Sequence, residues 1–257
     1  MTEPQEMILG NRIWFGSIAS QDDIFEGSPH FVADPNYLEL EAITHLVSRN
    51  MVGASASEVD AFARRMFAEL SDPGIFAERT GLMIERYSQL FRESSILSLF
   101  RDARVQRNWS DYATQGAGFG AVFDFREPWP LESARGLDIL AVPFPVDYVP
   151  ADEPPIIRIR AAPVYGEEGF DDIKIALLTK SDEWRSQGEE RLFRMGIGPG
   201  HVEFPAASLR AMLVGYAASK ETEELVVGLC RNRQVPIPVF RVEPAPPSRR
   251  LALRQLA

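Results

Sequence analysis

The sequence is poor in the residues that build disulfides and metal sites. It has a single cysteine, Cys230, and three histidines, His30, His45 and His201. One cysteine excludes an intrachain disulfide and a thiolate-rich metal site, and the histidines are not paired at ligand spacing. We therefore expect no metal cofactor and interpret the histidines as turn, surface or core residues. The scarcity of cysteine fits a reducing compartment, so the predicted localisation is cytoplasmic.

Long apolar runs and an excess of basic charge are also missing. No run approaches the ~18 residues that a bilayer-spanning helix needs. The opening segment, MTEPQEMILG, has acidic residues where a secretory peptide has basic ones. These features predict a chain without a membrane segment or leader. With 37 Asp and Glu against 27 Lys and Arg, the net charge is −10, and this acidic field disfavours broad nucleic-acid binding.

What is present is an ordinary globular composition. The chain has 257 residues, of which 45% are hydrophobic and 25% charged, enough to bury a sizeable core. Helical spacing of apolar residues is concentrated in the first half, with caps that mark the helix starts. The predicted helices run from an Asp34-Pro35 cap to about Asn50, from a capping box of Ser55 and Glu58 to Leu70, over about 82–91, over about 171–180, and from an N-cap at Ser219 to about Cys230.

Strand-like segments dominate from Ser95 onward. Helices followed by strands predict an α+β fold, with a helix-rich N-terminal half around a mixed, mainly antiparallel central sheet. We expect one domain over residues 1–243 and a detachable C-terminal tail over 244–257. The predicted strands are 13–15, 95–100, 118–125, 137–144, 155–161, 201–204, 210–216 and 238–243.

Two glycine series, at 116–120 and 196–200, invite a phosphate-loop interpretation. A dinucleotide fingerprint needs a strand before it and a helix after it, and neither series has that context. We therefore predict turns at both. The second series follows Arg191 and Arg194, so part of an anion pocket is its alternative interpretation. Cys230, on an apolar helix face, is predicted to be a core residue.

Polar and aromatic residues gather in two stretches, 108–112 and 180–191. If the end of the second stretch is extended, Gln187, Glu189 and Arg191 project from one face, because strand side chains alternate. A carboxamide, a carboxylate and a guanidinium would then line one surface. The alternative interpretation is a solvated charged edge beside a helix end.

Four phrases spread over about residues 12–242 carry a family resemblance. They are Ile13-Trp14-Phe15 with Asp22-Asp23-Ile24-Phe25-Glu26-Gly27; Trp109, Ser110, Tyr112 and Ala113 with Gly118 and Phe123; Lys180, Ser181, Trp184, Glu189 and Arg191 with Gln187; and Phe204-Pro205 with Leu209 to Leu229. In this order they resemble the bacterial domain of unknown function 2971 family. The family's usual Asn, Pro and His are replaced here by Asp22, Ile24 and Gly116.

The third phrase also resembles the Gln/Glu-x-Glu signature of ADP-ribosyltransferases, which split the nicotinamide bond of NAD. The resemblance implies NAD as a co-substrate, with Glu189 stabilising the positive charge that develops on the ribose and Gln187 orienting the acceptor. An aromatic ring would stack on nicotinamide, and Arg191 would contact the pyrophosphate. The implied catalytic residues are Glu189, Gln187 and Tyr112, and the implied NAD-binding residues are Trp109, Arg191 and Lys180.

Three functions stay open at this point, and so does the oligomeric state. The first is an NAD-consuming effector, a toxin or phage-defence protein that modifies a protein or nucleotide substrate. The second is a non-catalytic ligand- or protein-binding module in which the aromatic residues are core anchors and Arg191 pairs with an acid such as Glu26 or Asp22. A nucleic-acid-acting enzyme ranks last because of the acidic charge. A fully buried Glu189 bonded to Arg191, with no cleft beside it, would favour the second function.

Overall fold

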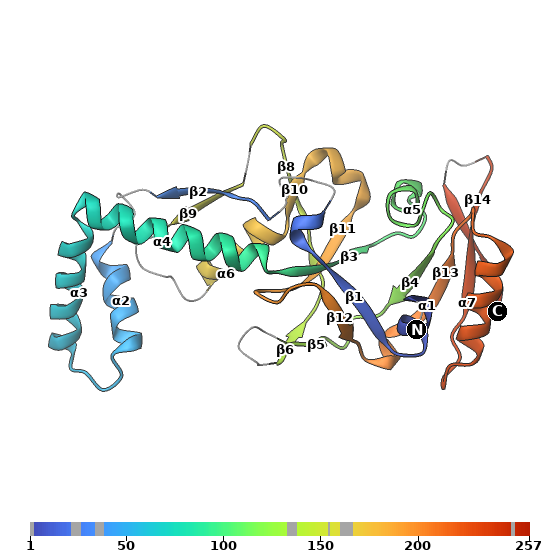
Figure 1. The fold of residues 1–257 in the computed structure, drawn as a ribbon, viewed down its shortest axis with the longest axis horizontal. Coiled ribbons are helices and arrows are strands. Elements are labelled where there is room, and N and C mark those ends of the chain that lie inside the picture. Colours follow the sequence, from blue (N-terminus) through green and yellow to red (C-terminus); the bar gives the residue numbers. More distant parts are fainter. Residues whose placement is uncertain are drawn as a thin grey trace. The chain divides into compact units, whose positions relative to one another are not determined.

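A computed structural model describes residues 3–21, 27–33, 39–132, 138–153, 155–159, 167–247 and 250–257 of the chain (Figure 1). The predicted Asp34-Pro35 cap and the acidic turn at 22–26 lie outside these ranges. The chain divides into two compact units, each assembled from separate stretches of sequence. Unit 1 comprises Met1–Ser17, Ser94–Val146 and Glu183–Ala257, and unit 2 comprises Ile18–Glu93 and Asp147–Asp182.

The first sheet of unit 1 is five-stranded and antiparallel, in the order β12-β1-β3-β11-β7. Its strands are β12 (Gly200–Glu203), β1 (Arg12–Ser17), β3 (Ser95–Phe100), β11 (Glu189–Arg194) and β7 (Phe144–Pro145). In β1, Ile13 and Phe15 are buried, whereas Trp14 between them is 49% exposed, as alternation along a strand requires. The predicted strand at 13–15 is confirmed, and two of its three residues are buried.

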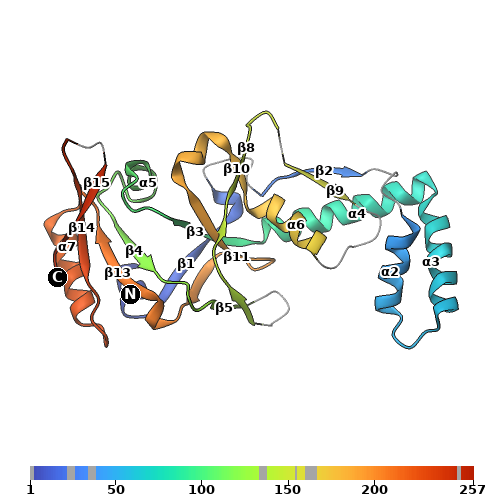
Figure 2. The same cartoon turned by 180° about the vertical axis from the view of Figure 1, so that it is seen from behind.

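The second sheet of unit 1 has the order β15-β14-β13-β4. Only its β13–β14 pair is parallel, and α7 makes the crossover between these two strands (Figure 2). The predicted cap of α7 is confirmed, since Ser219 Oγ accepts from the Thr222 N–H at 3.2 Å. The bounds are β15 (Leu251–Gln255), β14 (Val239–Pro244), β13 (Leu209–Val214), β4 (Phe119–Phe123) and α7 (Lys220–Arg231).

The segment that we expected to be a detachable tail contributes β15 to this sheet. Leu251 is buried in a cluster with Trp109, Leu213 and Val242, and β15 pairs with β14 from Leu251 to Gln255. Leu251 thus gains a buried position, and the backbone of the tail gains ladder hydrogen bonds. The prediction of a detachable tail therefore fails for residues 251–255.

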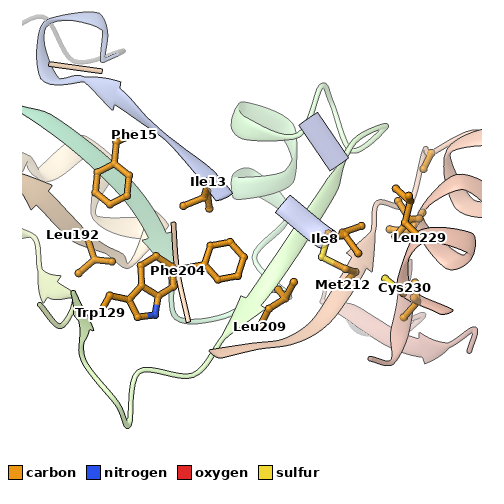
Figure 3. Packing of buried hydrophobic residues seen from close by; sticks show 14 of the residues in the cluster. Ile8, Ile13, Phe15, Trp129, Leu192, Phe204, Leu209, Met212, Leu229 and Cys230 are labelled. Atoms are coloured by element: carbon orange, nitrogen blue, oxygen red, sulfur yellow. The ribbon is translucent and has the colours of Figure 1, made fainter. Parts of the chain in front are cut away.

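The core of unit 1 combines aromatic residues around Trp129 with aliphatic residues such as Ile8 and Leu209 (Figure 3). Trp129 is fully buried, and its ring centroid lies 4.8–5.3 Å from those of Phe123, Phe125 and Phe204. Helix α7 adds Leu229 and Cys230 to the same core, so the prediction that Cys230 is a core residue is confirmed. The remaining elements of unit 1 are α1 (Glu3–Ile8), α5 (Gln106–Tyr112), β5 (Trp129–Glu132), β6 (Asp138–Ala141) and η4 (Ala206–Ser208).

In unit 2, three helices follow one another along the chain: α2 (Leu40–Asn50), α3 (Ala56–Leu70) and α4 (Pro73–Arg92). Helices α2 and α3 lie side by side as a hairpin (Figure 1). The capping box of Ser55 and Glu58 at the start of α3 is confirmed. Helix α4 begins at Pro73 rather than near residue 82, because Asp72 Oδ1 accepts from the N–H groups of Gly74 and Ile75. Asp72-Pro73-Gly74 is therefore a helix start.

Short strands complete unit 2 and join in two parallel pairs, β2 with β9 and β8 with β10. Helix-rich and strand-rich parts with mixed, mainly antiparallel sheets make the fold α+β, as predicted. Among the described residues, no helix is long and apolar enough to cross a membrane. The bounds are β2 (His30–Ala33), β8 (Asp147–Val149), β9 (Ile156–Ile159), β10 (Thr179–Ser181), α6 (Glu167–Leu177) and η1 (Ile18–Ser20), and η3 (Asp182–Gln187) spans the boundary with unit 1.

Candidate functional site

Strand β11 places Glu189 and Arg191 on one face of the five-stranded sheet. Its neighbour β3 puts Ser98 directly opposite Arg191, so all three side chains project from that face. Glu189 Oε1 accepts from Ser98 Oγ and from Arg191 Nε, each at 2.6 Å. Both charged side chains are 0% exposed. The predicted carboxylate and guanidinium therefore form one buried network.

This network differs from the ion pair beside it on the same strand. Glu190 points to the other face and accepts from Arg101 Nε at 2.7 Å, and these side chains are 27% and 63% exposed. Water screens an exposed pair of this kind. The Glu189–Arg191 pair lies out of contact with water, where each partner compensates the desolvation of the other. Of the two adjacent glutamates, Glu189 is the one whose loss leaves a buried charge behind.

Gln187 lies next to this strand but is not part of it. It is the last residue of η3, and Gly188, with φ of +58°, turns the chain before β11 begins. The alternation that we predicted therefore holds for Glu189 and Arg191 and fails for Gln187. Its buried amide makes contacts of its own: Oε1 accepts from the Tyr112 hydroxyl at 3.4 Å, and Nε2 donates to Asp111 Oδ2 at 3.3 Å.

Helix α5 supplies the aromatic candidates. The Trp109 ring is buried in the cluster that includes Leu251, and its Nε1 donates to the Ala103 carbonyl at 2.7 Å. Trp109 is thus a core anchor, with its ring covered by protein. Tyr112 is 39% exposed, and its ring centroid lies 4.8 Å from that of Phe100.

Further contacts fasten η3 to α5. Asn108 Nδ2 donates to the Gln187 carbonyl at 3.1 Å, and its Oδ1 is a buried atom without a hydrogen-bond partner among the described residues. The Arg107 guanidinium lies 5.0 Å from the Trp184 ring centroid and donates to Asp111 Oδ2 at 3.3 Å. The two polar and aromatic stretches of the sequence are thus in direct contact. Their side chains hydrogen-bond and pack mainly against each other.

Ser98 belongs to the buried network but was not a predicted site residue, whereas Lys180 was predicted and belongs to unit 2. Ser98 interrupts the apolar run SILSLF, and a polar residue inside a strand of this kind was the available signal for a buried hydrogen bond. Lys180 belongs to unit 2, where it lies buried on β10. Tyr112, Gln187, Glu189 and Arg191 all belong to unit 1.

Both glycine series form turns, as predicted. In the first, Thr114, Gln115 and Gly116 have φ of +50°, +56° and +81°, and a Cβ on Gly116 would collide with the Tyr216 ring. In the second, the Gly196 N–H donates to Ser94 Oγ at 3.1 Å, and β12 begins at residue 200. Neither series leads into a helix, so the phosphate-loop interpretation lacks its structural context.

The comparisons add no known relative to this geometry. No family model, curated protein or solved structure matches the chain, so the resemblance to the domain of unknown function 2971 family stays a prediction. In the described ranges, no group of three or more His, Cys, Asp or Glu side chains is placed to hold a metal ion. NAD does not fit the site in this conformation, because the Glu189 carboxylate that would contact its ribose is buried against Arg191.

Proposed function

We propose that this chain is a non-catalytic protein-binding module in which the Gln-x-Glu-x-Arg segment stabilises the fold. The observation that carries the proposal is the buried Ser98–Glu189–Arg191 network. A carboxylate that stabilises a ribose cation must touch the ribose. Glu189 touches a serine and an arginine of its own sheet, and its side chain has no exposed surface.

The other motif residues support the same proposal. Trp109 anchors α5 in the core, and Gln187 links η3 to Tyr112 and Asp111. Arg191, which would have to contact a pyrophosphate, donates to Glu189. Each of these contacts holds neighbouring elements of unit 1 together. We place the protein in the cytoplasm, as its single cysteine predicts.

The binding surface that we propose is the outer face of β1 and β12. Trp14 and His201 lie directly opposite each other in the ladder and pack edge to face, with ring centroids 5.1 Å apart. Trp14 is half exposed, on the face opposite buried Ile13 and Phe15. Exposed tryptophan is the residue type most enriched at the energetic centres of protein interfaces.

Incubation with labelled NAD tests the non-catalytic part of the proposal. We expect no nicotinamide release by the purified chain, with or without cell lysate, and the same result for Glu189→Gln. Both proteins must first show cooperative unfolding, so that inactivity is not misfolding. Nicotinamide release by the wild-type chain that disappears in a folded Glu189→Gln variant would overturn the proposal.

A photoreactive amino acid tests the binding surface. Placed at His201, which is exposed beside Trp14 and leaves that side chain intact, it should capture a discrete protein from lysate, whereas the same group at Val122, an exposed residue on β4, should not. An excess of wild-type chain should suppress the capture, and an excess of folded Trp14→Ala should not. Equal suppression by both competitors would show that Trp14 does not contribute to binding at this surface.

The ADP-ribosyltransferase is the second candidate, and one contact favours it. The Tyr112 hydroxyl lies 3.4 Å from Gln187 Oε1, two residues before Glu189, so the three catalytic candidates are neighbours. For this function the Glu189 carboxylate would have to leave Arg191 when NAD binds. The nicotinamide assay decides between the two candidates, because only this one requires turnover by the wild-type chain.

A further inference from the structure

The outer edge of β15 belongs to a different sheet from Trp14. Among the described residues, β15 pairs only with β14, so it forms one edge of the four-stranded sheet. Its register with β14 runs without a shift from Leu251 to Gln255. The strand LALRQ contains no proline or bulge, and its one charged residue, Arg254, is paired with Glu243, so little protects this edge from pairing.

Two hydrogen bonds at its ends show which backbone groups of β15 face outward. The Ala245 N–H donates to the Arg250 carbonyl, and the Leu256 N–H donates to the Val239 carbonyl. In an antiparallel ladder, the inward-facing residues alternate, so 250, 252, 254 and 256 bond to β14. The N–H and C=O groups of Leu251, Leu253 and Gln255 therefore point away from the sheet. The Leu253 side chain is 45% exposed.

We propose that this edge pairs antiparallel with β15 of a second copy of the chain, in a register centred on Leu253. The two copies would then share one continuous sheet. This register places Leu253 opposite Leu253 of the second copy and Leu251 opposite Gln255. Each of the three outward residues thus forms a hydrogen-bonded pair with a residue of the second copy. Each pair exchanges two backbone hydrogen bonds, which gives six in total.

Side chains select this register over its neighbours. In the register centred on Leu253, Arg254 lies opposite Ala252 of the second copy. The charge of Arg254 is already neutralised within its own chain by Glu243, whose Oε1 accepts from Arg254 Nε at 2.7 Å. A register centred on Arg254 would set the two arginines opposite each other, which is unfavourable. One centred on Ala252 would align only two of the three outward residues. The edge is therefore self-complementary in one register.

Two matched proline variants test the pairing. Leu253→Pro removes an outward N–H and no bond to β14, and proline is tolerated at such an edge position. In sedimentation over a concentration series, we expect the wild-type chain to self-associate and a folded Leu253→Pro to stay monomeric. Ala252→Pro removes an inward bond and should lower the unfolding temperature instead. A wild-type chain that is monomeric throughout, or a Leu253→Pro variant that associates equally, would overturn the proposal.

Thiol cross-linking tests the register and does not depend on the proline variants. The native Cys230 is buried, so an introduced cysteine is the accessible one. In the proposed register the two Cα atoms at position 253 lie about 5.5 Å apart, whereas those at position 255 lie roughly 14 Å apart. A short bis-maleimide should therefore link Leu253→Cys far faster than Gln255→Cys. Equal rates, or faster linking at 255, would contradict the register. This outcome does not depend on the protein-binding function proposed above, because no other partner is present.

Discussion

Removal of the Glu189 carboxylate tests whether this residue serves stability or chemistry. Glu189→Ala removes the carboxylate that pairs with the buried Arg191 guanidinium and accepts from the Ser98 hydroxyl. Breaking a fully buried pair by removing one partner costs about 3–5 kcal/mol. Glu189→Gln keeps an oxygen that can accept from both donors, so its cost should be smaller.

The assay is urea unfolding followed by circular dichroism, with Glu190→Ala as the matched control. Glu190 is the next residue of β11, and its pair with Arg101 is exposed, so its loss should cost at most ~1 kcal/mol. We expect the ranking Glu189→Ala, Glu189→Gln, Glu190→Ala, from the most to the least destabilised. The double variant Glu189→Gln with Arg191→Met should recover part of the loss, because it removes both buried charges.

The opposite ranking would refute this reasoning. If Glu189→Ala unfolds at the same urea concentration as Glu190→Ala, the buried pair contributes nothing to stability. Residues kept for chemistry are often dispensable for stability or even unfavourable to it. That result would therefore favour the ADP-ribosyltransferase candidate.

Three further predictions concern single residues elsewhere in the chain. Ser55→Ala removes the N-cap of α3 and should lower the free energy of unfolding by ~1 kcal/mol in the same urea assay. Gly116→Ala should cost more than ~1 kcal/mol in that assay, because its φ is +81° and its Cβ would collide with the Tyr216 ring; a stable variant would contradict the turn. Burial raises the pKa of the Cys230 thiol from 9.0 to about 11. The folded state thus holds this proton more tightly, so its contribution to stability is full below pH 9 and is lost as the pH rises from 9 to 11. In thermal unfolding, Cys230→Ala should lose less stability over that interval than the wild-type chain, and an identical pH profile would contradict the shift.

Local signals in the sequence predicted much of the fold. The capping box of Ser55 and Glu58, the N-cap at Ser219 and the short apolar strand at 13–15 each depend on neighbouring residues, and the structure has all three. The predicted start of α4, near residue 82, was wrong because Asp72-Pro73-Gly74 is equally typical of a turn and of a capped helix start. In the structure it is a helix start, because the Asp72 side chain accepts hydrogen bonds from the backbone N–H groups of Gly74 and Ile75.

Features that depend on distant residues could not be predicted. The tail becomes β15 because Leu251 meets Trp109 and Val242, and no local pattern reveals that contact. The division into two units is similarly hidden, because no change of composition marks their boundaries. At the site, alternation correctly put Glu189 and Arg191 on one face, whereas the turn at Gly188 separated Gln187 from them.

The interleaving of the two units has a consequence for synthesis on the ribosome. Unit 2 is complete once residue 182 has been made, whereas unit 1 needs strands from the last 75 residues of the chain, 183–257. Strand β1 pairs with β12, which is translated about 185 residues later. At typical translation rates of 5–20 residues per second, this delay is roughly 10–40 s. During this delay, Ile13 and Phe15 lack their partner strand β12. The nascent chain therefore exposes an apolar segment that general chaperones would recognise.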